Sequence, residues 1–247
     1  MPDARESSRR ARPRVWHHDY LHLRPLSREL ERGIAAARSE RSFHAVLDIG
    51  SGGSPYRAWF GNAARYYVRL DADAAHRPTA VGRAEALPFR DATFDAILFT
   101  QVWGLVSDPR RAAIEIERVA RPGARLWLSG PAGWPYDSAA PEHRFGVPDL
   151  PALFSGLEIL EIIPQWGMLV VPFAVLNLVV REAVIAAGRR VSAAGRVLAW
   201  PAAALYVLSN LAGRILVLLA QRGPVAPFLG YLDRRMPTNF VVVARKR

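Results

Sequence analysis

The chain has 247 residues, 51% of them hydrophobic, so it is long enough for one sizeable α/β domain and too apolar to be generally disordered. It has no cysteine, which excludes disulfides, thiolate metal sites and a cysteine nucleophile, and suits a reducing compartment such as the cytoplasm. The formal net charge of +11 comes almost wholly from arginine. It favours anionic partners such as lipid head groups or nucleic acid, although a coding bias toward arginine explains it equally well.

The N-terminal stretch MPDARESSRRARPR is charged and has no apolar core, so we expect neither a signal peptide nor a membrane anchor there. We predict a basic mobile arm over residues 1–20, followed by one domain over residues 21–247. Leucines at positions 21, 23, 26 and 30 recur near helical spacing, which predicts a helix that is interrupted near Pro25 and leads into the first strand.

Strand candidates then alternate with helix candidates, which predicts βαβ units and a mainly parallel sheet. A helix at about 109–120 is expected to stop at Pro122 and Gly123. The predicted strands are residues 43–49, 66–71, 79–81, 94–100, 125–129, 157–163 and 239–244.

The most informative segment is DIGSGGS, which follows the first predicted strand. Its strand ends on Asp48 and runs into Gly50 and Gly52, where the backbone can turn sharply and approach a ligand. A second acid, Asp71, ends the next strand, RYYVRLD. Because glycine-rich turns after buried strands are typical of nucleotide sites, these residues predict a small-molecule site at this edge of the sheet.

Some seventy residues separate the sixth and seventh predicted strands, too many for a structureless loop. Two uncharged runs, 162–180 and 197–213, predict two apolar helices joined by a basic segment, within an insertion of about 166–233. Prolines in the first run and Arg214 after the second argue against helices that span a membrane. Four interpretations stay open: extra core, the wall of an apolar pocket, peripheral contact with a membrane through the 166–222 helices, and, least favoured, helices that span the membrane.

Four segments in order resemble the class I S-adenosylmethionine-dependent methyltransferases, in particular the type 11 group. They are DIGSGGS, YYVRLDAD, VGRAEALPFRDATFDAILFTQV and DPRRAAIEIERVARPGARLWLSGP, and together they cover residues 42–131. The resemblance implies a Rossmann-like, seven-stranded, mainly parallel sheet with helices on both faces and an antiparallel last strand. It also implies S-adenosyl-L-methionine as the cofactor.

The resemblance also implies roles for individual residues. Asp48 is expected to orient the loop and the amino end of the cofactor's methionine part, and Asp71 to accept hydrogen bonds from the ribose hydroxyls. The full set of expected cofactor-binding residues is Asp48, Gly50, Ser51, Gly52, Asp71, Ala84, Glu85 and Gln101.

Three positions depart from the family's pattern. Ser54 replaces the last glycine of the motif, Arg83 stands where an adenine-binding Asp is usual, and Leu105 stands where a His is common. His143, in PEHRFGVPDL, is the remaining candidate for a catalytic base.

The sequence lacks the D/N/S-P-P-aromatic segment of base-amino methyltransferases and any cysteine for pyrimidine methylation, so nucleic acid is an unlikely substrate. Binding of RNA by the basic arm stays a separate alternative. The WHHDYLH cluster has no recognised metal-ligand spacing, so no metal is expected.

These observations predict an enzyme that methylates oxygen or nitrogen of a small-molecule or lipid-like acceptor, either free in the cytoplasm or at the inner membrane surface. The alternative is a non-catalytic module that binds S-adenosylmethionine and recruits a membrane or protein partner. The oligomeric state is not predicted.

Overall fold

The computed structural model describes residues 4–132, 149–190, 192–222 and 226–247. Its strands are β1 Phe43–Ile49, β2 Ala64–Asp71, β3 Ala80–Val81, β4 Phe94–Thr100, β5 Ala120–Pro131, β6 Leu157–Gly167 and β7 Pro237–Lys246. Its helices are α1 Ala4–Ala11, α2 Tyr20–Glu40, α3 Arg57–Phe60, α4 Pro109–Val119, α5 Asp149–Ala152, α6 Val171–Arg190, α7 Ser192–Arg222 and α8 Ala226–Arg235.

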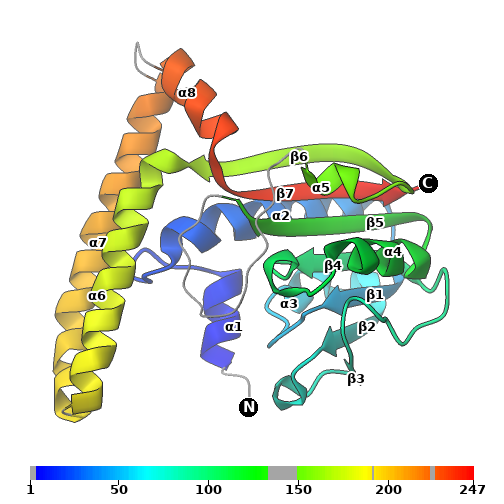
Figure 1. Cartoon of the computed structure of the whole chain (residues 1–247), viewed down its shortest axis with the longest axis horizontal. Helices are drawn as coiled ribbons and strands as arrows, with labels where there is room; N and C mark the ends of the chain where they lie inside the picture. The colour runs from blue at the N-terminus through cyan, green and yellow to red at the C-terminus, as the bar shows by residue number, and fades with distance from the viewer. Residues whose placement is uncertain (1–3, 133–148, 191, 223–225) are drawn as a thin grey trace.

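The described strands form one seven-stranded sheet in the order β3-β2-β1-β4-β5-β7-β6 (Figure 1). β1 to β5 pair in parallel, whereas β7 is antiparallel to both β5 and β6. The predicted Rossmann-like, mainly parallel sheet with an antiparallel last strand is therefore confirmed. The sheet has the reversal of strand order beside β1 at which open α/β sheets bind ligands.

Each central strand sends alternate side chains into two hydrophobic layers. In β4, Ile97 and Phe99 pack on the side of α4, and Leu98 packs on the side of α2. In β5 the same alternation buries Trp127 completely against α2. Because both faces are covered, the middle of each strand is an apolar run, residues 96–99 in β4 and 126–128 in β5, which the sequence marks clearly.

The N-terminal segment departs from the expected mobile arm. Residues 4–11 form α1, and the chain around residues 15–18 is held by side chains from the insertion. The interruption expected near Pro25 is also wrong, because α2 is continuous through this residue. Pro25 removes one backbone hydrogen bond, but buried leucines on both sides of it, Leu23 and Leu26, keep the helix on the sheet.

The insertion forms a long helical hairpin, α6 and α7, followed by α8. The hairpin stands beside the sheet and covers neither of its faces (Figure 1). Buried asparagines fix it: the Asn177 side chain donates to the His18 carbonyl (3.1 Å) and to Asn210 Oδ1 (2.8 Å). Asn210 in turn donates to the carbonyls of Val15 (2.7 Å) and His17 (2.9 Å).

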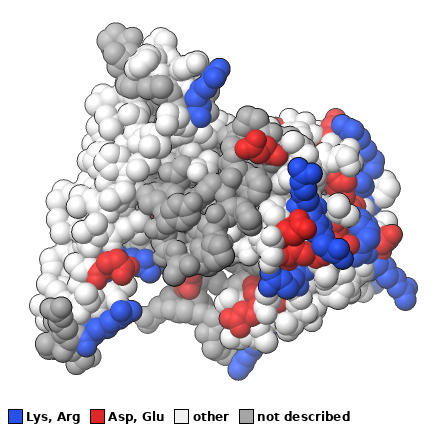
Figure 2. Space-filling view, in the orientation of Figure 1, with Lys and Arg blue, Asp and Glu red and all other residues white. Residues whose placement is uncertain are grey.

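Most of the hairpin's apolar surface is exposed. Segments 168–189 and 197–222 are long and apolar enough to cross a membrane. Of the most apolar 18-residue stretch in each segment, however, only 17% and 28% of the residues are buried. In Figure 2 much of the side formed by this hairpin is uncharged above a few charged side chains at its lower end, while more charged residues gather over the sheet domain. The low burial removes the interpretation of these helices as extra core.

Candidate functional site

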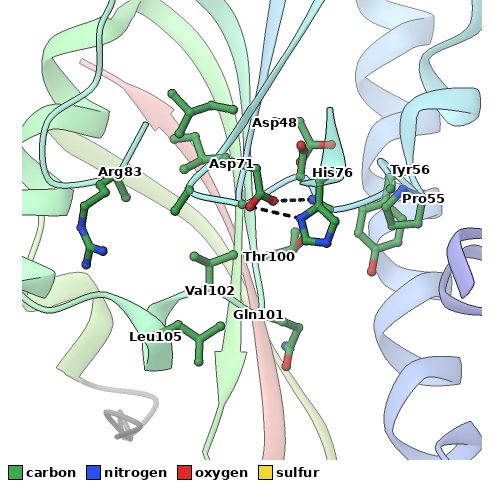
Figure 3. A pocket seen from close by; sticks show the side chains of 18 of the residues that line it. Asp48, Pro55, Tyr56, Asp71, His76, Arg83, Thr100, Gln101, Val102 and Leu105 are labelled. Atoms are coloured by element: carbon green, nitrogen blue, oxygen red, sulfur yellow. Dashed lines mark hydrogen bonds and ion pairs between the residues drawn. The ribbon is translucent and has the colours of Figure 1, made fainter. Parts of the chain in front are cut away.

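A cavity of about 400 Å³ lies at the carboxyl ends of β1, β2 and β4 (Figure 3). Parallel strands bring their carboxyl ends to one edge of the sheet, so residues that are far apart in the chain meet there. All eight residues expected to bind the cofactor line this cavity, namely Asp48, Gly50, Ser51, Gly52, Asp71, Ala84, Glu85 and Gln101.

The loop after β1 requires glycine at Gly50. This residue has φ +66°, and a Cβ atom there would lie 2.4 Å from the Val102 side chain. Gly52 also has a positive φ, +47°, but its Cβ position lies in open space, so its bare backbone faces a region that a ligand can fill. Ser54, in place of the family's last glycine, adopts φ +54° and keeps the left-handed turn.

Asp48 is almost completely buried, with 2% of its surface exposed. The Tyr67 hydroxyl, from the neighbouring strand β2, donates a hydrogen bond of 2.8 Å to Asp48 Oδ2. Burial raises the pKa of Asp48 to about 7, against the lowering effect of Tyr67. A cation bound beside Asp48 would stabilise its charged form.

Asp71 is held as a charged acceptor. Burial alone would raise its pKa, but hydrogen bonds to the carboxylate from the amides of Asp73 (2.9 Å) and Gly52 (2.7 Å), with help from His76, lower the pKa below its ordinary value. His76 Nδ1 lies 3.2 Å from Asp71 Oδ1 (Figure 3). The second carboxylate therefore also fixes the glycine loop, through Gly52.

The segment after β3 forms another wall. Glu85 Oε1 accepts hydrogen bonds from the Ser107 amide (2.7 Å) and from Arg83 (3.2 Å). Burial disfavours the charge of Glu85, but these hydrogen bonds lower its pKa overall. Arg83, which replaces the usual Asp, also donates to the Ser107 hydroxyl (2.7 Å), and its largely exposed side chain lies apart from Asp48 and Asp71 (Figure 3).

Gln101 closes the cavity after β4 in a left-handed conformation, with φ +60°. Its backbone N–H donates to the Ser129 carbonyl (2.8 Å), and its side-chain Nε2 donates to Ser129 Oγ (3.3 Å). A non-glycine residue in this region is costly and is often found at functional sites. Leu105, where the family often has His, lines the same cavity and supplies neither acid nor base.

The structure adds residues that the sequence did not indicate. Glu6, Ser7 and Arg10 of α1 line the cavity, although their segment was expected to be a mobile arm. A charged octapeptide of this kind carries no apolar stripe that would predict packing. His143, the expected catalytic base, lies outside the described residues. Within the described part of the chain no group of three or more His, Asp or Glu residues could hold a metal ion.

The cavity has features that fit a nucleoside ligand with a cationic end. The Ser51 hydroxyl is buried without a hydrogen-bond partner among the described residues. Gly52 presents bare backbone to open space, and two buried carboxylates from neighbouring strands face the same volume. Unpaired donors and acceptors of this kind call for a polar ligand.

Comparisons with known proteins agree with this geometry. A family model described as a methyltransferase domain matches residues 47–128. An uncharacterized methyltransferase of Mycobacterium tuberculosis is 34% identical over 109 residues, which are 40% of this chain and 44% of that protein. A demethylmenaquinone methyltransferase of Streptomyces avermitilis is 30% identical over 105 residues, 38% of this chain and 46% of that protein. The matches therefore span less than half the length of these relatives.

Solved structures resemble the fold over most of the chain. A Galdieria sulphuraria protein, assigned as a sarcosine dimethylglycine methyltransferase, has a TM-score of 0.56 and 13% identity over 91% of this chain and 88% of its own. The [4+2]-cyclase SpnF has a TM-score of 0.54 and 18% identity over 89% and 80%. At these identities they show the fold alone.

The non-catalytic alternative gains no support from the curated relatives, which are named as methyltransferases. The ordered motifs, the sheet and the family match agree on one assignment, whose cofactor is S-adenosylmethionine. Residues 47–128 therefore match the methyltransferase domain of the class I, S-adenosylmethionine-dependent family, within a sheet of that family's fold.

Proposed function

We propose that this chain transfers a methyl group from S-adenosylmethionine to a small-molecule or lipid-like acceptor, at oxygen or nitrogen. One observation carries the proposal: the carboxylates that end β1 and β2 line a single cavity beside a glycine loop with an open face. S-adenosylmethionine supplies an electrophilic methyl group on a sulfonium, so the protein's main task is to hold donor and acceptor aligned.

We call the cavity of about 400 Å³ the donor cavity. In this proposal each of its polar groups contacts one part of the cofactor. Asp48 pairs with the amino group of the methionine part, and its charged form is stabilised by that cation. Asp71 accepts hydrogen bonds from the ribose hydroxyls, using lone pairs that its backbone donors leave free. Ala84 and Glu85 contact the adenine, and Gln101 the methionine part.

Isothermal titration calorimetry with S-adenosylmethionine and S-adenosylhomocysteine tests the donor site. We expect Asp71→Asn to weaken binding of both about tenfold or more, because a hydrogen bond to a charged acceptor is worth about 1.5–3 kcal/mol. Asp73→Asn is the matched control, since the Asp73 side chain accepts from the Ala75 amide and does not line the cavity. Absence of binding by the wild-type chain would refute the proposed function.

The exposed hairpin supports a second part of the proposal: contact with a membrane surface from the cytoplasmic side. Both helices present large apolar side chains to solvent, and Trp200 is 84% exposed. Arg189, in the last turn of α6, is exposed at this end of the hairpin, where it would attract anionic lipids. A lipid-like acceptor would then reach the enzyme from that surface.

A further inference from the structure

A second cavity, of about 370 Å³, adjoins the donor cavity. It lies among α1, the chain around residues 18–23, the turn after β4 and helix α6. The two cavities have four lining residues in common, Glu6, Arg10, Gln101 and Leu105. A molecule in the second cavity would therefore lie next to the end of the donor cavity that Gln101 closes.

One wall of the second cavity is polar and contains a histidine beside a carboxylate. His18 Nε2 lies 3.9 Å from Asp19 Oδ2, and Arg9 of α1 lies 3.4 Å from the same oxygen. The other carboxylate oxygen of Asp19 is buried without a hydrogen-bond partner among the described residues. This oxygen is free to accept a further hydrogen bond.

The opposite wall belongs to the hairpin. Leu178 and Arg181 of α6 line the cavity, and Leu23, Leu105 and Pro131 add further apolar surface. Other α6 side chains near Leu178, namely Val175, Leu176 and Val179, are exposed to solvent. An apolar chain attached to a molecule in the cavity could therefore continue along α6 and remain on apolar surface.

The position of His18 is fixed by the hairpin. Its carbonyl accepts a hydrogen bond from Asn177, the residue just before Leu178 on α6, and Asn177 is almost completely buried. The His18 ring lies 6.1 Å from the Tyr206 ring of α7. The insertion thus builds one wall of the cavity and also holds the histidine on the other.

We infer that the second cavity is the acceptor site, that it takes the hydroxyl-bearing head group of an amphiphile, and that His18 is the catalytic base. The inference rests on the proposed methyl transfer. The acceptor's O–H proton passes to the His18 imidazole, and the new oxygen–carbon bond forms as the methyl–sulfur bond breaks. The sulfonium becomes the neutral thioether of S-adenosylhomocysteine. Asp19 stabilises the imidazolium, and the acceptor's apolar tail lies along α6.

The surroundings of His18 suit a base near neutral pH. Burial lowers its pKa, Asp19 raises it, and Arg9, Arg181 and His17 lower it, with a net decrease below 6.5. The imidazole is therefore unprotonated at pH 7 and able to accept a proton. The titratable or charged residues around it are Glu6, Arg9 and Arg10 of α1, His17, Asp19, His22, Arg181 of α6 and Tyr206 of α7.

The test uses the full chain, S-adenosylmethionine labelled with tritium in its methyl group, and two probes: a bacterial polar-lipid extract in detergent micelles and the water-soluble extract of the same cells. We expect label in the lipid fraction. His18→Asn should lower that rate about 100-fold, as for loss of a general base, and leave the Kd for S-adenosylhomocysteine unchanged. His44→Asn, at an exposed position on β1, is the matched control and should behave as wild type.

Two further measurements separate catalysis from structure. The wild-type rate should rise with pH below the His18 pKa and then level off, whereas the residual rate of His18→Asn should keep rising as the acceptor's hydroxyl ionises. Leu178→Trp should fill the second cavity and abolish labelling without changing affinity for S-adenosylhomocysteine. An unchanged thermal midpoint, together with that affinity, shows that each variant is folded.

The outcomes are distinguishable. If wild type binds S-adenosylmethionine but labels only the water-soluble extract, or labels neither, the amphiphile site is overturned and the donor site stands. If His18→Asn labels lipid at the wild-type rate, or keeps a wild-type pH profile at lower rate, His18 is not the base. If wild type fails to bind S-adenosylmethionine, the proposed function fails with everything that rests on it.

Discussion

At the scale of single residues, the buried carboxyl of Asp48 makes the stability of the chain depend on pH. Its buried carboxyl has a pKa of about 7 in the folded chain against 3.8 for the unperturbed group. The folded state therefore holds this proton more tightly, and the group's contribution to stability falls as the pH rises from about 4 to about 7. Above pH 7 this loss of stability reaches about 4 kcal/mol, and a cation bound beside Asp48 would offset it.

Asp48→Asn should remove this pH dependence, because an amide does not titrate and can still accept from the Tyr67 hydroxyl. We expect the thermal midpoint of the variant, relative to wild type, to rise from about pH 4 to about pH 7 and to level off above it. His17 and His18, whose pKa values are lowered, act in the opposite direction in both proteins and cancel in the difference. Parallel profiles for wild type and variant would contradict a raised pKa of Asp48.

Two residues away from both cavities test how backbone conformation contributes to stability. Ala92 has φ +48° and is exposed, so Ala92→Gly should raise the free energy of unfolding by about 1 kcal/mol. Gly123 has φ +79° with open space at its Cβ position, so Gly123→Ala should lower it by about 1 kcal/mol through backbone strain alone. Urea unfolding measures both; changes of the same sign would contradict the assigned conformations.

At the scale of elements, the sequence predicted the sheet well because burial on both faces makes its strands continuous apolar runs. β1 and β4 match their predicted bounds, and α4 ends one residue early, at Val119. β5 begins earlier than predicted, at Ala120, because that residue pairs with Phe94 across an irregularity in the ladder. Pro122 and Gly123 therefore lie within a strand and do not form a separate turn.

The residues that line the first cavity could be grouped from the sequence because they follow strand ends in a recognisable order, whereas those of the second cavity could not. His18 and Asp19 belong to a cluster whose spacing suggested no site, and Leu178 belongs to an apolar run that fits a core helix equally well. Only tertiary packing, through Asn177 and Asn210, brings these segments together. Long-range contacts between an N-terminal segment and an insertion leave no local pattern in a sequence.

At the scale of the whole molecule, charge and apolar surface are segregated. The sheet domain carries most of the charges visible in Figure 2, and the charged side chains of the hairpin side gather at its lower end. Exposed apolar area of this extent on two adjacent helices is unusual for a free surface in water. Together with the exposed Arg189 at the end of α6, it favours orientation of the whole domain on an anionic bilayer, with the second cavity on the side of the hairpin.

Flotation with liposomes tests this orientation. We expect the chain to float with vesicles containing phosphatidylglycerol, and to bind less to neutral vesicles or at high salt, because arginine contacts are screened. Leu219→Glu, at a position of α7 that is 63% exposed, should reduce binding about tenfold or more, because it replaces a buried apolar contact with a charge. Ile114→Glu, at a 64% exposed position on α4, is the matched control and should float as wild type. Equal loss in both variants would show that general hydrophobicity, and not the hairpin, holds the protein on the membrane. Failure of the wild type to float at low salt would remove the membrane from the proposed function. The donor cavity would stand as described in either case.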